Sequence, residues 1–206
     1  MVKSLLFDMD GVLIDAREWH YEALNRALWD IAQYRISKED HLSVFDGLPT
    51  KVKLVMLGER GVLKEAQHEA VFRLKQRHTM NIIKQNCKPD PVKIDMMHKL
   101  HAYKKACVTN SIYKTTYEML VHSGLNYYMD YVQGNEATAF AKPNPSPYLK
   151  AMSVLGIEPK ETLIIEDSDT GYTAAVKSGA FVEQLDYPDV TFESVMEAIR
   201  RVDEVH

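Results

Sequence analysis

Two aspartates one residue apart, Asp8 and Asp10, follow an apolar run near the start of the chain. A carboxylate can attack phosphorus to form an aspartyl-phosphate. A second carboxylate beside it can protonate the leaving alcohol and deprotonate the incoming water. Residues two apart on a strand point the same way. The spacing therefore suits a nucleophile next to a proton carrier, although either aspartate alone could equally be a strand-end cap or a turn residue.

Two more polar clusters follow short apolar runs that we interpret as strands. These clusters are Thr109-Asn110 and Glu166-Asp167. Ligands of open parallel sheets bind beyond the carboxyl ends of the strands, so all three clusters are expected at one edge of the sheet. The sequence thus predicts one site built from three strand ends.

Carboxylates crowd this predicted site. The four are Asp8, Asp10, Glu166 and Asp167. Groups of like charge within a few ångströms cannot all stay ionised without a cation. Hard oxygen ligands with room for water and phosphate oxygens favour Mg²⁺. Thr109 adds a hydroxyl donor and Lys142, in the loop AKPNPSPY, adds an ammonium group. A cation, a lysine and a hydroxyl together make a site for a phosphate dianion.

The elements that must position these residues alternate along most of the chain, which predicts a parallel sheet covered by helices on both faces. Strands are expected at 2–7, 106–108, 128–132, 162–165 and 180–182. Helices are expected at 17–32, 51–57, 64–83, 91–101, 112–123, 145–155, 170–178 and 191–202. The block after the first strand is helical with no strand between, and a break is expected at 43–49, around Asp46-Gly47.

The segments DMDGVLID, VTNS, KPNPSPY and IIEDSDTGYTAAVKSGA resemble, in order, the four motifs of the haloacid dehalogenase-like superfamily. The resemblance covers nearly the whole chain and is closest to the branch of helical-cap phosphatases and β-phosphoglucomutase-like enzymes. It implies an α/β fold: a Rossmann-like parallel-sheet core at 1–15 and 86–206, with an inserted all-helical cap domain at 16–85.

The resemblance also implies a role for each motif residue. Asp8 would be the nucleophile, and Asp10 the acid and base that also lends its main-chain carbonyl to the metal. Thr109 would bind the phosphoryl group with Asn110 beside it, and Lys142 would orient Asp8. Metal ligands would be Asp8, Asp10, Asp167 and Glu166, the last directly or through water. Ser168 and Gly171 would shape the last metal loop. From the residues themselves, Thr109 could also cap the helix from Ile112, and Asp169 is expected to cap the helix from Thr170.

Signals in the helical block are weaker. The segment 45–51 resembles the loop that touches substrate in this branch, so Lys51 is a candidate for contact with the substrate's far phosphate or hydroxyls. Lys51 and Lys53 could equally form a solvated helix face. His20, on the first helix of the block, and Lys75 are further candidates, each with a structural role as the alternative.

Composition excludes several classes of protein. The chain has 206 residues and a formal net charge of −4, which gives no electrostatic case for nucleic acid or an anionic membrane surface. No apolar stretch approaches the ~20 residues that span a bilayer. Asp8 and Asp10 break the one apolar segment near the N-terminus, so no signal peptide is expected. A cytoplasmic protein is expected, with a monomer favoured.

We therefore expect a Mg²⁺-dependent phosphatase that hydrolyses a small phosphorylated metabolite, such as a sugar or polyol phosphate, through an aspartyl-phosphate. The first alternative is a sugar phosphomutase. Mutases of this branch commonly carry a small hydroxyl residue just after the cap-side aspartate, where this chain has Ala16, and this favours water as the acceptor. The second alternative is a non-catalytic protein that binds phosphometabolites. A metal-binding D-x-D of the glycosyltransferase type explains neither Lys142 nor Glu166-Asp167.

Overall fold

The structure is a computed structural model that describes residues 1–45 and 47–205. The chain divides into two compact units, which are described separately below. The first, the core unit, comprises Met1–Asp15 and Lys88–His206, and the second, the cap unit, comprises Ala16–Cys87.

The core unit is built on a five-stranded parallel sheet with the strand order β3-β2-β1-β4-β5. Its strands are β1 (Ser4–Phe7), β2 (Lys104–Val108), β3 (Tyr131–Gln133), β4 (Thr162–Glu166) and β5 (Phe181–Gln184). The first strand lies between β2 and β4, with Phe7 in register with Cys107 on one side and Ile165 on the other. This arrangement confirms the predicted α/β fold with a parallel sheet.

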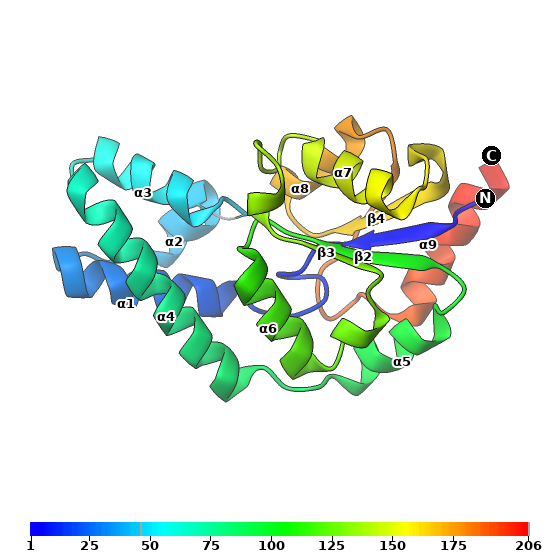
Figure 1. Ribbon diagram of the computed structural model, residues 1–206, viewed down its shortest axis with the longest axis horizontal. Coiled ribbons are helices and arrows are strands. Elements are labelled where there is room, and N and C mark those ends of the chain that lie inside the picture. The colour runs from blue at the N-terminus through cyan, green and yellow to red at the C-terminus, as the bar shows by residue number, and fades with distance from the viewer. Residues whose placement is uncertain (46, 206) are drawn as a thin grey trace. The chain divides into compact units, whose positions relative to one another are not determined.

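Helices cover both faces of this sheet (Figure 1). They are α5 (Pro91–Lys99), α6 (Tyr113–Ser123), α7 (Ser146–Leu155), α8 (Asp169–Lys177) and α9 (Phe192–Val205). Figure 1 shows α7 and α8 on one face and α5, α6 and α9 on the other. Under α7 and α8, Leu6, Ala106 and Ile164 of the three central strands pack in one buried apolar cluster with Tyr148 and Ala174. Burial on both faces explains why these strands read as short, almost wholly apolar runs.

The cap unit is helical, as predicted for the block after the first strand. Its helices are α1 (Arg17–Ala32), α2 (Lys38–Asp40), α3 (Thr50–Glu59) and α4 (His68–Asn86). No strand occurs among residues 16–45 and 47–87. Its own buried core includes Leu24 and Leu28 from α1, Leu57 from α3 and Val71 from α4.

Several predicted boundaries shift, for local reasons. The predicted helix 64–83 begins with a 3₁₀ turn at Glu65–Gln67 and continues as α4 to Asn86, just before the Lys88-Pro89 pair. The predicted break at 43–49 overlaps a π-helical turn at His41–Phe45. Asp46, at the centre of that break, lies outside the described residues.

Candidate active site

The predicted strand ends do meet at one edge of the sheet. Asp8 follows β1 and its backbone N–H still donates to Ile165 O of β4, at 3.0 Å. Thr109 follows β2, and Glu166 ends β4. Because these three strands are parallel neighbours, their carboxyl ends open on the same side. One carboxylate oxygen from each of Asp8, Glu166 and Asp167 lies within 4.8 Å of the other two, close enough to hold a metal ion.

Lys142 reaches into the centre of this cluster from the loop before α7, and its side chain is only 3% exposed. Its Nζ donates to Asp8 Oδ1 at 2.6 Å and to Glu166 Oε1 at 2.5 Å. A third bond reaches the main-chain oxygen of Val108, at 2.7 Å. An ammonium group has three hydrogens. These three acceptors therefore fix the position of Lys142 against the side chain of Asp8.

The site carries more negative charge than one lysine offsets. Burial raises the pKa of Asp8 well above its ordinary value; Lys142 opposes this shift, while Glu166, Asp167 and Asp10 add to it. Burial lowers the pKa of Lys142, but the charges of Asp8 and Glu166 outweigh this, so its pKa is raised overall. An additional cation would relieve the repulsion among the carboxylates. The donor set of hard oxygens fits Mg²⁺.

Glu166 is fully buried, and its carboxylate is held on every side. Oε1 accepts from Lys142 and from the hydroxyl of Tyr148. Oε2 accepts from the backbone N–H of Asp167 at 3.2 Å and the hydroxyl of Ser168 at 3.4 Å. A carboxylate has about four acceptor positions. Since all four are used, Glu166 anchors Lys142, and direct ligation of a metal would require it to give up a hydrogen bond.

The first turn of α8 packs against the carboxylate of Glu166. Ser168 is its N-cap and accepts from the backbone N–H of Gly171 at 3.1 Å, so the prediction that Asp169 caps this helix is wrong. A Cβ atom on Gly171 would overlap the carboxylate of Glu166. A glycine is needed there because the helix backbone passes directly against that side chain.

Asp10 lies in a tight turn beyond β1, not on the strand itself. Gly11 has a φ of 92°, a left-handed conformation that favours glycine. Its N–H donates to Ile14 O at 2.8 Å and closes the turn. The Asp10 carboxylate accepts from the hydroxyl of Ser111 through Oδ2, at 3.0 Å. It is not part of the metal-capable group found among the described residues, which leaves its predicted metal contact, through the main-chain carbonyl, a prediction.

The loop after β2 is held by its own polar groups. Thr109 is buried, and its Oγ1 accepts from the backbone N–H of Ser111 at 3.0 Å. The helix α6 begins at Tyr113 and its N-cap is Ile112; the first backbone N–H, that of Tyr113, donates to the carboxylate of Glu136, at 2.9 Å to Oε2. The prediction that Thr109 also caps this helix is therefore wrong.

Asn110 donates from Nδ2 to Lys142 O at 3.1 Å and accepts on Oδ1 from Lys142 N at 3.0 Å. The Asn110 amide thus joins this loop to the lysine loop, and its predicted contact with substrate stays a prediction.

Two side chains that contact the site, Tyr148 and Ser111, are not among the residues named from the sequence. Tyr148 lies six residues after Lys142, inside the segment KPNPSPY, and Ser111 is the last residue of VTNS. Other residues of these two segments are the predicted site residues. The hydroxyl groups of Tyr148 and Ser111, in the same segments as those residues, are the one sequence feature that could have identified them.

Within the cap unit, the structure brings together two of the candidates. His20 Nδ1 lies 3.2 Å from Lys75 Nζ, between α1 and α4, and Lys75 is only 6% exposed. Lys51 is exposed on α3, with its Nζ 5.6 Å from the ring centroid of Phe72. The neighbouring Lys53 is buried, so the two lysines do not share one solvated face. Contacts of His20 and Lys51 with substrate stay predictions.

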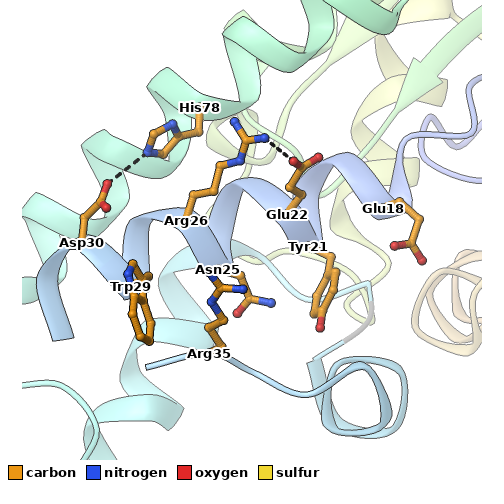
Figure 2. A pocket seen from close by; sticks show the side chains of 9 residues that line it. All are labelled: Glu18, Tyr21, Glu22, Asn25, Arg26, Trp29, Asp30, Arg35 and His78. Atoms are coloured by element: carbon orange, nitrogen blue, oxygen red, sulfur yellow. Dashed lines mark hydrogen bonds and ion pairs between the residues drawn. The ribbon is translucent and has the colours of Figure 1, made fainter. Parts of the chain in front are cut away.

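A pocket of about 650 Å³ also lies on the cap unit, along α1 (Figure 2). Its charged groups are largely paired: Arg26 with Glu22, and His78 with Asp30 at 3.5 Å. Neither His20 nor Lys51 lines it. The lining holds three carboxylates, Glu18, Glu22 and Asp30, against two arginines, Arg26 and Arg35. The pocket therefore offers little attraction for a phosphate group, and the carboxylate cluster of the core unit is the better candidate for chemistry.

No helix in the described part of the chain has both the length and the apolar character needed to cross a bilayer.

This chain is similar to known proteins in its sequence and in its fold. The sequence model of the family described as "Haloacid dehalogenase-like hydrolase" matches residues 5–183. The phosphoglycolate phosphatase of Aquifex aeolicus (strain VF5) is 27% identical over 183 residues, which cover 86% of this chain and 82% of that protein. The fructose-1-phosphate phosphatase YqaB of Escherichia coli (strain K12) is 27% identical over 178 residues, which cover 85% and 92%.

Among solved structures, the β-phosphoglucomutase from Clostridium difficile superposes on this chain with a TM-score of 0.83. The superposition covers 99% of this chain and 100% of that one, at 18% sequence identity. At this identity the likeness shows a common fold.

Proposed function

Because the chain belongs to the haloacid dehalogenase-like hydrolase family, we propose that it is a Mg²⁺-dependent phosphatase that hydrolyses a sugar or polyol phosphate through an aspartyl-phosphate on Asp8. It falls in the helical-cap branch, related to phosphoglycolate phosphatase and β-phosphoglucomutase, and is a phosphatase of small phosphorylated metabolites. The metal, the substrate class and the intermediate are the proposed part.

The observation that carries this proposal is the position of Lys142 between Asp8 and Glu166. An ammonium group 2.6 Å from Asp8 Oδ1 favours the ionised form of that buried carboxylate and fixes the direction in which it points. An ionised, oriented carboxylate is what a nucleophile for phosphorus requires. Glu166, bonded on all sides, holds Lys142 in turn.

The residues that would hold the metal are Asp8 and Asp167, with the main-chain carbonyl of Asp10 and, through water, Glu166. When bound, Mg²⁺ would neutralise charge on the phosphoryl oxygens and the carboxylates. The fit rests on the cluster itself, in which one oxygen from each of three carboxylates lies within 4.8 Å of the others.

In the proposed reaction, Asp8 attacks phosphorus as the ester P–O bond breaks. The leaving oxygen takes a proton from Asp10. A water molecule then attacks the aspartyl-phosphate, giving its proton to Asp10 and releasing inorganic phosphate and the free Asp8 carboxylate. Thr109, just after β2, offers a hydroxyl donor to the phosphoryl oxygens, and the positive charge of Lys142 offsets the negative charge of Asp8 beside them.

The substrate class comes from the relatives. The names of the two relatives described above specify phosphoglycolate and fructose 1-phosphate, which are small phosphate monoesters with alkyl leaving groups. A leaving alkoxide needs a proton donor, and Asp10 provides one. A sugar or polyol phosphate fits this chemistry.

The test is phosphate release from a panel of sugar, polyol and small-acid phosphates, with MgCl₂ and with a chelator. We expect release from at least one member of the panel with MgCl₂ and none with chelator. Isomerised sugar phosphate, formed only with a bisphosphate primer and without release of phosphate, would instead indicate a mutase. No turnover of any substrate, with or without metal, would indicate a protein that only binds phosphometabolites.

A further inference from the structure

Ser111 makes a direct contact with the proposed proton carrier, and no role was assigned to it from the sequence. Its hydroxyl donates to Asp10 Oδ2 at 3.0 Å. Both side chains are half-buried in the core unit. The carboxylate of an aspartate turns about two bonds, so one oriented hydrogen bond restricts which oxygen faces the reacting atoms.

Ser111 is itself held in place by its main chain. Its backbone N–H donates to Thr109 Oγ1 at 3.0 Å, and its carbonyl oxygen accepts from the backbone N–H of Asn135 at 2.9 Å. Asn135 also donates from Nδ2 to Asn110 O, at 2.8 Å. These bonds fix the backbone from which the Ser111 hydroxyl reaches Asp10.

The turn that carries Asp10 fixes its backbone, because the Gly11 N–H bond to Ile14 O closes the main chain. The direction of the carboxylate depends on side-chain contacts, and Ser111 supplies one from the loop after β2.

We propose that Ser111 is a positioning residue: it holds Oδ2 of Asp10 so that Oδ1 faces the leaving-group oxygen and delivers the proton to it. This inference rests on the proposed function, because it needs Asp10 to act as the acid. In the step concerned, the P–O bond breaks, its electron pair stays on the leaving oxygen, and the proton of Asp10 neutralises that oxygen.

Leaving groups of different basicity separate positioning from a merely structural role. An alkyl phosphate expels a strongly basic alkoxide that needs a proton, whereas p-nitrophenyl phosphate expels a weakly basic phenolate that does not. The quantity to compare is kcat/KM, which reports the first chemical step. General acid catalysis contributes about 10²–10⁴-fold, so a mispositioned acid should cost a large part of that on the alkyl substrate alone.

The variants are Ser111→Ala, Ser111→Thr and Asp10→Asn, with Ser146→Ala as the matched control. Ser146 is a half-buried serine of the same unit whose hydroxyl bonds to Asn144. We expect Ser111→Ala to lower kcat/KM for an alkyl phosphate by at least about 10-fold and for p-nitrophenyl phosphate by less than about 3-fold. Ser111→Thr should restore most of the loss, and Ser146→Ala should change neither value.

The double variant Ser111→Ala/Asp10→Asn should be no slower on the alkyl substrate than Asp10→Asn, because both changes remove the same function. Equal losses on both substrates, or additive losses in the double variant, would overturn the proposal.

A structural measurement separates this proposal from the proposed function. In crystals of Ser111→Ala, the Asp10 carboxylate should turn away from its wild-type direction, and in Ser111→Thr it should keep it. An unchanged Asp10 in Ser111→Ala would refute the positioning role even in a fully active enzyme. An Asp8→Asn variant that keeps its activity would refute the aspartyl-phosphate mechanism and leave the rotation of Asp10 as a separate result.

Discussion

Replacing Lys142 by methionine should destabilise the metal-free protein by about 3–5 kcal/mol, the usual cost of removing one partner from a buried ion pair. The side chain of Lys142 is 3% exposed and that of Glu166 is fully buried. Without the ammonium group, the carboxylates of Asp8 and Glu166 face each other with no opposite charge between them, and Val108 O loses a donor. Methionine fills a similar volume, so the loss comes from charge and hydrogen bonding.

The assay is urea unfolding at neutral pH, in chelator and again in excess MgCl₂. In chelator we expect the full loss, and in MgCl₂ a smaller one, because a bound cation would compensate the carboxylates. Adding Glu166→Gln to Lys142→Met should recover part of the stability, since the neutral amide removes one of the two uncompensated charges.

Lys150→Met, on the exposed face of α7, is the matched control and should change stability by less than about 0.5 kcal/mol. If Lys142→Met in chelator is as stable as the wild type within about 1 kcal/mol, the ion pairs do not hold this site together. The argument that Lys142 fixes Asp8 would then be refuted.

Three further predictions concern Gly171, the binding of Mg²⁺ and the thiol of Cys87. Gly171→Ala should destabilise the protein by about 1–3 kcal/mol in urea unfolding, because its Cβ overlaps the Glu166 carboxylate, while Lys177→Ala on the exposed side of α8 should not. MgCl₂ at 100 times its Kd should stabilise the wild type by about 2.7 kcal/mol in thermal unfolding, and Asp167→Asn should abolish the shift; an unchanged shift would exclude Asp167 as a ligand. Burial raises the pKa of Cys87 from 9.0 to about 11, so its thiol stays protonated up to higher pH in the folded state. At pH 9, iodoacetamide should therefore modify Cys87 about 50-fold more slowly in native than in urea-unfolded protein, judged by peptide mass; equal rates would contradict the burial.

Several residues of the site could be named from the sequence because they lie at the ends of short apolar strands; Lys142, in the loop before α7, has no such signal. Parallel strands present their carboxyl ends at one edge, so Asp8, Thr109 and Glu166 had to lie near one another once β1, β2 and β4 were neighbours. The order of those strands is set by packing between distant segments, which the sequence pattern does not reveal.

Hydrogen-bond partners could not be predicted in the same way. Asp169 and Ser168 are both good N-cap residues, and only the register of α8 decides that Ser168 takes the position. Thr109 was expected to cap α6, but that helix begins too late, and its hydroxyl bonds to Ser111 N instead. A shift of one or two residues in a helix start changes which side chain meets which donor.

Glu166 illustrates a second limit. Its type and position fit a metal ligand, but its bonds to Lys142 and Tyr148 come from the segment KPNPSPY, 24 and 18 residues earlier in the chain. Such long-range contacts have no local signature in the chain. For the same reason no local pattern in the sequence predicts the hydrogen bond between Ser111 and Asp10.

The rate of phosphate release by Asp8→Asn tests the central claim most directly. The substrate is the best one from the phosphate panel, in MgCl₂, with freshly purified protein whose fold is checked by circular dichroism. Asp95→Asn, at an exposed aspartate of α5 that pairs with Lys99, is the matched control and should keep wild-type activity. We predict that Asp8→Asn keeps less than about a thousandth of the wild-type kcat, a rise of at least ~4 kcal/mol in the barrier. Activity above that level would contradict Asp8 as the nucleophile.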